Sequence, residues 1–400
     1  MARSFDNPFV SSGREAIIAE AVRTPIGRAN AEKGWYRDVH PNVLLGAVYT
    51  ELLERSGVAP GSIEDLIIGC TAPFGEQSRN IARNAWLQAG YPPEVPGMVL
   101  DRRCGSAQTA VEIGASFISS GTHELVIAGG VEHMGHVPIN SPAVIEEIYG
   151  KAWTPEMWAR YDFVTQGEAA ELIRERWGIS REEQDDFAVR SHELAAAAIA
   201  AGRFDDELVR MTVDGEARHG DQSVRPGTTA EVLAGLKPAF REQNGTVTAG
   251  SSSPLSDGAA GVLLASRAAV ERHGLAARAR ILDQTTVGVD PIIMLTGPIP
   301  ATRKLLERNG LGIHDIDLIE INEAFSSVVL AWERELQPDL DRVNVNGGAI
   351  ALGHPVGATG SRLFATLLAE MERRDVELGL VTMCCGGGLG TATLIQRLPA

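Results

Sequence analysis

Two residues in this sequence could take part in covalent chemistry, and the first is a histidine in a glycine-containing loop. His354 lies between Gly353 and Pro355, ahead of a segment whose apolar residues have helical spacing. Proline suits the first turn of a helix, because it needs no N–H partner there and its φ is already helical. The pattern therefore predicts an exposed imidazole on a tight loop at a helix N-terminus, where it could act as a general base.

The second residue is Cys104, which stands in a turn after Arg103 and before Gly105, ahead of an amphipathic helix expected over 107–118. A thiol at a helix N-terminus is expected to have a lowered pKa, because backbone N–H groups and the helix dipole stabilise the thiolate. A neighbouring histidine would lower that pKa further and accept the proton. The alternative is a small buried side chain, the usual state of a single cysteine. The position in a turn favours a nucleophile.

Other residues could assist this pair. Cys384 and Cys385 precede three glycines, and neighbouring cysteines are too close for an ordinary disulfide, so we expect one to be buried and one to be active. Asn322 follows a strand expected over 317–321, and it could either cap the next helix or hold a water or a substrate carbonyl. Trp153 and Trp158 are more typical of packing than of a stacking surface.

Short apolar strands that alternate with amphipathic helices must position these residues, which is the pattern of a sheet covered by helices. Residues 99–130 and 343–388 share one layout: a strand, a loop with one reactive residue, a helix and an apolar strand. In the first stretch we expect that last strand to end at Ala128, before two glycines. The sequence therefore predicts an α/β protein of two similar halves with mixed sheets, in which Cys104 and His354 occupy equivalent loops.

The middle of the chain differs in composition from both halves. Residues 135–150 carry prolines and little periodicity, so a loop is expected there, and 205–250 is polar and rich in turn residues. We divide the chain into an N-terminal half (1–135), an inserted loop domain (136–254), a return segment (255–278) and a C-terminal half (279–400).

Composition opposes several classes of function. A chain of 400 residues, 44% of them hydrophobic, can bury a large core, and its net charge of −16 opposes non-specific binding to nucleic acid. No apolar run approaches the ~20 residues that cross a bilayer. Residues 1–10 lack the pattern of a signal peptide. The 4 cysteines have neither disulfide-framework nor metal-site spacing, so we expect no metal and a cytoplasmic location.

The motifs together resemble those of the thiolase family over nearly the whole chain, and they are most similar to degradative 3-ketoacyl-CoA thiolases. In chain order they are 22–27 (VRTPIG), 80–84 (NIARN), 103–106 (RCGS), 129–138 (GGVEHMGHVP), 250–258 (GSSSPLSDG), 322–325 (NEAF), 346–360 (NGGAIALGHPVGATG) and 384–390 (CCGGGLG). The resemblance implies a thiolase-like fold and cleavage of a 3-ketoacyl-CoA by CoA. It also implies coenzyme A as a co-substrate, with no permanently bound cofactor.

The resemblance implies a role for each candidate residue. Cys104 matches the nucleophile that becomes acylated, and His354 matches the base that activates it. Cys384, rather than its neighbour, matches the second catalytic cysteine, which protonates the acetyl-CoA enolate and later deprotonates CoA. Asn322, through a water, and His354 match the oxyanion site for the enolate. The backbone N–H groups of Cys104 and Gly386 match the oxyanion site for the tetrahedral intermediates.

Two residues match contacts to CoA, so the inserted loop domain is expected to bind substrate and CoA. Ser253 matches a serine that touches the pantetheine, and Arg225 matches an arginine near the nucleotide. Members of the family are homodimers or homotetramers, and some pair with a hydratase/dehydrogenase subunit. The sequence departs from the family pattern after Pro138 and at 166–171, which reads QGEAAE where the family has Met-Gly-x-Thr-Ala-Glu. Because this loop lines the acyl pocket in relatives, the length of the acyl chain stays open, as does a ring-bearing or steroid group.

Three alternatives to a degradative thiolase stay open from the residues. A biosynthetic enzyme of the same family would run the reaction towards acetoacetyl-CoA. A condensing enzyme acting on carrier-protein thioesters would usually pair its cysteine with two histidines, or with histidine and asparagine, so a second cysteine before glycines favours a thiolase. A non-catalytic acyl-CoA-binding protein is opposed by the presence of Cys104, His354 and Cys384 together.

Overall fold

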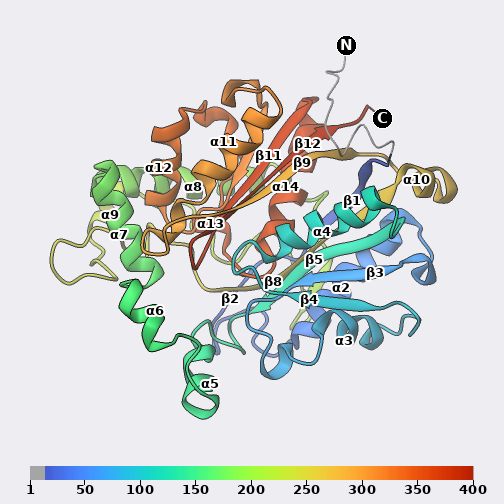
Figure 1. Ribbon diagram of the computed structural model, residues 1–400, viewed down its shortest axis with the longest axis horizontal. Helices are drawn as coiled ribbons and strands as arrows, with labels where there is room; N and C mark the ends of the chain where they lie inside the picture. Colours follow the sequence, from blue (N-terminus) through green and yellow to red (C-terminus); the bar gives the residue numbers. More distant parts are fainter. Residues whose placement is uncertain (1–13, 400) are drawn as a thin grey trace.

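The computed structural model describes residues 14–399, so the expectation that residues 1–10 carry no signal peptide lies outside the described part of the chain. Two α/β halves form the body of the molecule (Figure 1). The N-terminal half contains β1 (Ala16–Arg23), β2 (Gly27–Arg28), α2 (Pro41–Ser56), β3 (Asp65–Gly69), α3 (Ile81–Gln88), β4 (Gly97–Leu100), α4 (Ser106–Ser120), β5 (Leu125–His133), β8 (Ser256–Ser266) and α10 (Arg267–His273). The C-terminal half contains β9 (Ala279–Gly288), α11 (Pro298–Arg308), β10 (Leu318–Ile321), α12 (Ser326–Leu336), α13 (Ala349–Leu352), α14 (Thr359–Arg374), β11 (Leu378–Cys385) and β12 (Leu389–Arg397).

The main strands form one continuous mixed sheet in the order β4-β3-β5-β8-β1-β9-β12-β11-β10. The two halves of this sheet join where β1 pairs with β9, and that pairing involves only Ile17 and Ile18 of β1. If the strands of each half are numbered in chain order, both halves place them in the same spatial order across the sheet. In the C-terminal half the position of β4 is taken by Val343, which forms a parallel bridge to Ile319. The prediction of two similar α/β halves with mixed sheets is confirmed.

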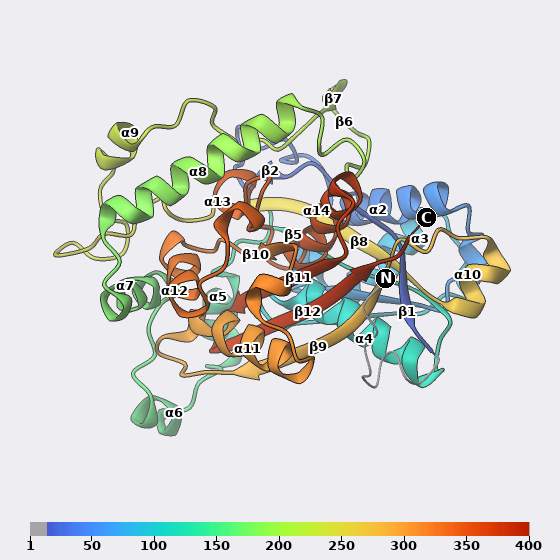
Figure 2. The same cartoon turned by 90° about the horizontal axis from the view of Figure 1, so that it is seen from above.

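Each strand contributes alternate residues to different cores, as the two-residue period of a strand requires. On β3, Leu66 packs with α2 and α3, whereas its neighbour Ile67 packs with α4 and α14. On β11, Val381 also faces α4 and α14, whereas Leu380 packs with α11 and α12 on the opposite face. The molecule is therefore layered, with α4 and α14 at its centre between the two halves of the sheet (Figures 1 and 2).

The two central helices approach each other at a glycine. A Cβ on Gly360 of α14 would lie 2.2 Å from the backbone nitrogen of Gln108 on α4. Protein interiors are packed at nearly crystalline density, so no side chain fits between backbones this close. This contact brings together the N-terminal ends of α4 and α14, and the loops that precede them carry Cys104 and His354.

Strand β5 is longer than expected, because it runs through Gly129 and Gly130 and ends at His133. The expectation that the strand ends at Ala128 was wrong. A Cβ on Gly130 would lie 1.9 Å from the carbonyl oxygen of Gly357, so the glycine is needed for close packing inside a strand. Glycine pairs that allow close packing look the same in sequence as glycine pairs that form a turn.

The residues between β5 and β8 form a separate set of elements, of which helices α5 to α9 lie on the left in Figure 1 and strands β6 and β7 lie above the body in Figure 2. Helices α7 and α8 pack on α12, where the hydroxyl groups of Ser326 and Ser327 donate to the carbonyl oxygens of Gln184 and Ala170. We keep the division at 136–254 as a proposal supported by this arrangement. The elements are α5 (Ser141–Tyr149), α6 (Pro155–Arg160), α7 (Gln166–Trp177), α8 (Arg181–Ala200), β6 (Met211–Val213), β7 (Glu216–Arg218) and α9 (Ala230–Ala234).

Helix α5 corrects the expectation of a loop over 135–150. Pro142 occupies the first turn of this helix, where a missing N–H costs nothing, so the proline begins the helix and does not interrupt it. Neither α5 nor α6 contains a buried residue, and in Figure 1 both project beyond the body of the molecule. Within residues 14–399, no helix is long and apolar enough to cross a membrane.

Candidate functional site

Cys104 lies on the loop between β4 and α4, and it is buried, with 2% of its surface exposed. The preceding residue, Arg103, has a left-handed backbone with φ of 51°, a strained conformation that is common at functional sites. The N–H of Gly386 donates to the thiol sulfur. Burial nevertheless raises the pKa of Cys104 to about 11, and the N–H groups of Gly386 and Cys104 oppose this rise without reversing it. The expected lowering of the pKa was wrong.

His354 is also buried, with 6% exposure, so the expectation of an exposed imidazole was wrong. Its loop is covered by the N-terminal half, where the Ser256 hydroxyl accepts a hydrogen bond from the backbone N–H of His354 at 3.1 Å. Helix α14 begins at Thr359 and not at Pro355. The carbonyl oxygen of Pro355 instead accepts hydrogen bonds from the two residues that lead into the helix, Ala358 and Thr359.

Thr359 sets the tautomer of the imidazole. Its hydroxyl donates to the carbonyl oxygen of Pro355 at 2.9 Å and lies 2.6 Å from Nδ1 of His354. A hydroxyl has one proton to donate, so towards His354 it must accept, and Nδ1 therefore carries the hydrogen. The lone pair is then on Nε2. Burial, and secondarily the charge of Arg362, lowers the pKa of His354 to about 3, so the ring is neutral and its Nε2 can accept a proton.

Asn322 links the imidazole to a second thiol. Its Nδ2 lies 3.4 Å from Nε2 of His354, and its side chain also makes a hydrogen bond to Cys384. The other amide atom, Oδ1, is buried and has no hydrogen-bond partner among the described residues. A buried amide oxygen without a partner is costly, and it fits a bound water or a substrate oxygen. Helix α12 begins at Ser326, so Asn322 is not a helix cap.

The two neighbouring cysteines point to opposite faces of β11. Cys384 faces Asn322, and burial raises the pKa of its thiol well above the usual value, with a further contribution from the nearby Cys104. Cys385 lies behind the nucleophile's loop, where the N–H of Gly105 donates to its sulfur and where a Cβ on Gly105 would be 2.6 Å away. Both thiols are buried, but only Cys384 reaches the Asn322 amide.

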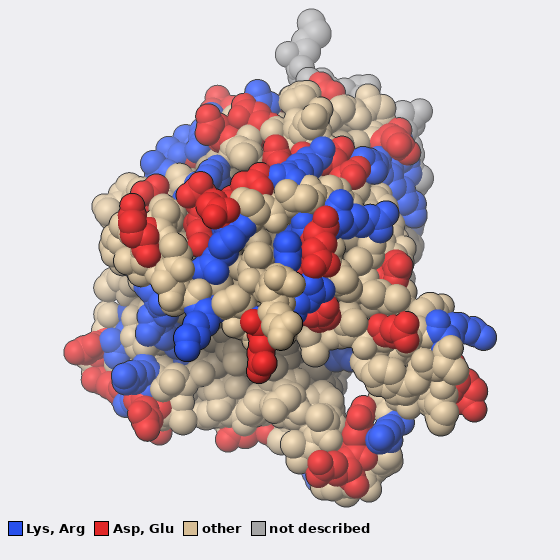
Figure 3. Space-filling view, turned by 90° about the vertical axis from the view of Figure 1, so that its left-hand side faces the viewer, with Lys and Arg blue, Asp and Glu red and all other residues tan. Residues whose placement is uncertain are grey.

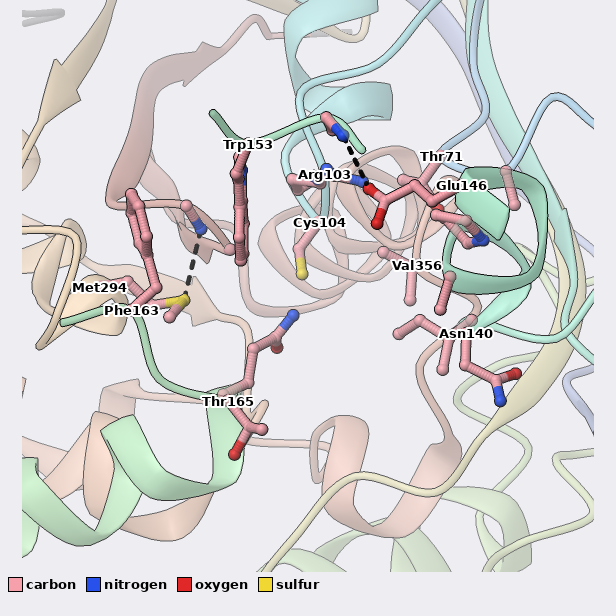
Figure 4. Close-up of a pocket in the computed structure, with 18 of the residues that line it drawn as sticks. Thr71, Arg103, Cys104, Asn140, Glu146, Trp153, Phe163, Thr165, Met294 and Val356 are labelled. Atoms are coloured by element: carbon pink, nitrogen blue, oxygen red, sulfur yellow. Dashed lines mark hydrogen bonds between the residues drawn. The ribbon is translucent and has the colours of Figure 1, made fainter. Parts of the chain in front are cut away.

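A cavity of about 880 Å³ opens beside the nucleophile. It is lined by Cys104, Gly386 and Gly387, and Figure 4 shows the Cys104 thiol facing its interior. Trp153 and Trp158 also line it and are 44% and 47% exposed, so their rings pack on each other at the cavity and not in the core. The signal that could have identified them is a run of aromatic residues in a segment with no buried helix face.

The two candidate CoA-binding residues lie outside the lining of this cavity. The N–H of Ser253 donates to the carbonyl oxygen of Ala324 at 3.0 Å, so Ser253 lies beside the segment that contains Asn322. Arg225 is exposed on the loop after β7, and its backbone N–H donates to Nδ1 of His192 on α8. The structure therefore brings the candidate catalytic residues together and places the candidate CoA contacts in and beside the loop domain.

The surface charges and the possible metal ligands are distributed as follows from the positions of the acidic and basic side chains. Figure 3 shows acidic and basic side chains interspersed on the face that carries the loop-domain helices, with no continuous basic surface on that face. Among residues 14–399, no three His, Cys, Asp or Glu side chains are placed to hold a metal ion. The buried active groups are thus thiols, an imidazole and amides.

The chain is similar to known proteins in both sequence and structure. Residues 16–268 match the family model "Thiolase, N-terminal domain", and residues 275–397 match "Thiolase, C-terminal domain". A steroid 3-ketoacyl-CoA thiolase of Mycobacterium tuberculosis is 44% identical over 98% of this chain and 97% of that protein. A 3-ketoacyl-CoA thiolase of Colwellia psychrerythraea is 43% identical over 96% of this chain and 100% of its own length. The crystal structure of the Bacillus anthracis acetyl-CoA acetyltransferase superposes with a TM-score of 0.86 at 39% identity, covering 96% and 99% of the two chains.

Proposed function

The chain belongs to the thiolase family, and on this premise we propose that it is an acyltransferase that cleaves a 3-ketoacyl-CoA with CoA, giving acetyl-CoA and a shortened acyl-CoA. The observation that carries the proposal is a buried group of residues: Asn322 makes hydrogen bonds to Cys384 and His354, and Cys104 is near enough to Cys384 to raise the pKa of its thiol. Cleavage of a C–C bond leaves a carbanion, which needs a nucleophile, a proton donor and donors for oxygen charge. These residues supply all three.

In the first half-reaction, Cys104 attacks the 3-keto carbon while Nε2 of His354 takes the thiol proton. The N–H groups of Cys104 and Gly386 hold the oxyanion of the tetrahedral intermediate. Each such donor typically lowers the activation barrier by about 3 kcal/mol. The intermediate collapses by breaking the bond between the second and third acyl carbons, and the electron pair enters the acetyl-CoA enolate. Cys384 then protonates that carbon, with the enolate oxygen held near His354 and the water proposed at Asn322.

In the second half-reaction, the Cys384 thiolate removes the proton of the CoA thiol. The CoA sulfur attacks the acyl thioester on Cys104, and the thiolate that leaves recovers its proton from His354. All groups return to their starting protonation states, so no redox partner is required. The tautomer fixed by Thr359 suits this role, because the lone pair of Nε2 is directed away from Nδ1 and towards the Asn322 side of the site.

The finer attributes of the enzyme follow from family resemblance. We propose a cytoplasmic, homo-oligomeric protein of fatty-acid β-oxidation type, since 4 cysteines in 400 residues do not have the spacing of a disulfide framework. Ser253 and Arg225 are proposed to contact CoA. A hydratase/dehydrogenase partner subunit is a further proposal that rests on the resemblance alone.

The test is thiolysis of acetoacetyl-CoA and of longer 3-ketoacyl-CoAs, followed by loss of the substrate enolate absorbance. We expect Cys104→Ala to abolish turnover, and Cys384→Ala to acylate Cys104 slowly but to block release. The matched control is Cys385→Ala, which removes the neighbouring thiol on the opposite face of β11 and should retain turnover. Mass spectrometry of the acylated peptide identifies the nucleophile, and full turnover by Cys104→Ala would disprove the assignment.

A further inference from the structure

The cavity beside Cys104 is much larger than a short acyl group requires. Its volume of about 880 Å³ lies near the upper end of the ~300–1,000 Å³ that is usual for sites of drug-sized ligands. The four-carbon group of acetoacetyl-CoA would leave most of such a cavity unfilled. Because the Cys104 thiol lies in the same cavity, the group attached to the reacting carbon can enter this space.

One wall of the cavity is a cluster of aromatic rings. Trp153 and Phe163 are stacked, with centroids 4.6 Å apart and planes inclined by 18°. Trp158 meets both of them edge-on, at 5.2 Å and 5.4 Å. In this arrangement each ring is held by the other two. The wall is therefore a cluster of mutually packed rings, although the segment that carries it has no residue in the core.

The opposite side of the cavity is mixed in character. Figure 4 shows Trp153 and Phe163 on one side of Cys104, and Val356 with Thr71, Glu146 and Asn140 on the other. Val356 is buried in the body of the protein. A group bound at Cys104 would thus meet its main apolar surface at the aromatic wall.

A rigid ring suits such a site better than a flexible chain. Half-exposed tryptophans beside a reactive thiol are an apolar surface that a ligand would cover. A flexible alkyl chain loses rotational freedom when it is confined against the wall, whereas a fused ring has little freedom to lose.

We propose that the aromatic wall formed by Trp153, Trp158 and Phe163 selects 3-ketoacyl-CoA substrates whose acyl group carries a bulky alicyclic ring next to the ketone. This inference rests on the proposed function and adds its substrate class and the residues that determine it. Trp153 is the main determinant, because it stacks on Phe163 and lies beside Cys104 in the cavity.

The experiment compares two substrates with equal carbon number in the variable group, decahydronaphthyl 3-oxopropanoyl-CoA and 3-oxotridecanoyl-CoA. We expect wild-type kcat/KM to be higher for the ring substrate by about tenfold or more, because the fused ring loses less rotational freedom on binding than a ten-carbon chain. Trp153→Ala should lower kcat/KM for the ring substrate by about 10- to 100-fold. The same substitution should change the straight-chain value by less than about threefold.

Two further variants separate selection from general damage. Trp153→Phe keeps a stacked ring and should restore most of the preference. Tyr149→Ala is the matched control, because Tyr149 is an aromatic residue of the same segment that is 82% exposed and lies outside the cavity lining. It should leave both substrates unaffected. Phe163→Leu provides a second test of the wall if Trp153→Ala lowers the melting temperature.

The outcomes distinguish this inference from the function on which it rests. A wild-type preference for the straight chain, or an equal loss of both activities in Trp153→Ala, would overturn the inference and leave the thiolase function intact. Absence of thiolysis with every 3-ketoacyl-CoA, acetoacetyl-CoA included, would instead overturn the proposed function. A loss confined to the ring substrate, with Trp153→Phe restoring it, supports both.

Discussion

The catalytic floor of the cavity and its aromatic wall are built in opposite ways. The floor comprises Cys104 and Gly386, which line the cavity, together with His354. It comes from the loops before the central helices α4 and α14 and from the end of β11. The wall comes from α5, α6 and the residues after them, a segment whose helices have no buried residue. The floor is fixed by the packing of the whole protein, whereas the wall is fixed mainly by its own rings.

His354 of the floor and Trp153 of the wall differ in how many hydrogen bonds hold them. His354 has a hydrogen bond at its backbone N–H and partners at both ring nitrogens. Trp153 has ring contacts but no hydrogen bond among those of the described residues. Reacting groups need positions fixed to within about half an ångström, whereas an apolar wall needs only shape. Changes in the floor should therefore affect every substrate equally, and changes in the wall should affect substrates differently.

The protonation state of the floor gives the largest expected effect. With a pKa of about 11 for Cys104 and about 3 for His354, the resting pair is a neutral thiol and a neutral imidazole. Below the pKa of the thiol, its thiolate fraction rises about tenfold for each pH unit. Alkylation of Cys104 by iodoacetamide should thus accelerate by about 100-fold over two pH units from neutral, measured by mass spectrometry of its peptide.

A thiolate–imidazolium pair would behave differently, because its alkylation rate reaches a plateau above the low pKa of the thiol. A plateau at or below neutral pH in the wild type would contradict the neutral pair. The His354→Ala variant serves as control, since removing a neutral imidazole should leave the shape of the profile unchanged. Trp153→Ala should also leave it unchanged if the wall does not influence the chemistry.

The close packing beneath the floor gives the second effect. Gly360→Ala would place a Cβ 2.2 Å from the backbone of α4, and forced overpacking of this kind costs about 1–3 kcal/mol or more. Gly46→Ala on α2 is the matched control, because its Cβ would lie 3.5 Å from the nearest atom and alanine is favoured over glycine inside a helix by about 0.5–1 kcal/mol. Thermal denaturation should show opposite signs. Equal melting temperatures for the two variants would mean that the central helices can separate without cost.

The contrast between floor and wall also explains what the sequence could predict. Cys104 and His354 were proposed because chemistry restricts residue type and because their loops follow strands in a repeated layout. The roles of Asn322 and Cys384 were proposed from the resemblance to thiolases. The burial of His354 was missed, since its cover comes from Ser256 in the other half of the protein. A contact between residues so distant in sequence leaves no local pattern.

The wall was missed for a different physical reason. Residues 141–149 form a helix without a buried face, so no apolar period marked it, and Pro142 suggested a loop. The tryptophans were assigned to packing because aromatic residues in most segments do pack. The rings can form a binding surface only because the folded chain places this segment beside Cys104. That placement depends on the fold of both halves and leaves no local pattern in the sequence.

Thr359 gives the smallest effect and the most specific test of the floor. Without the hydroxyl in Thr359→Val, the Nδ1–H of His354 loses its acceptor and the imidazole is no longer held in one tautomer. We expect kcat to fall about tenfold with KM nearly unchanged, as for a lost positioning hydrogen bond of about 1.4 kcal/mol. Thr359→Ser should restore the rate, because a serine hydroxyl can make the same two bonds. The decrease must be equal for ring and straight-chain substrates. The imidazole takes part in the reaction at the carbonyl carbon, which both substrates share, and not in the binding of the acyl group. A substrate-dependent loss would show that the floor also takes part in selection, and the division between a fixed floor and a selective wall would then be wrong.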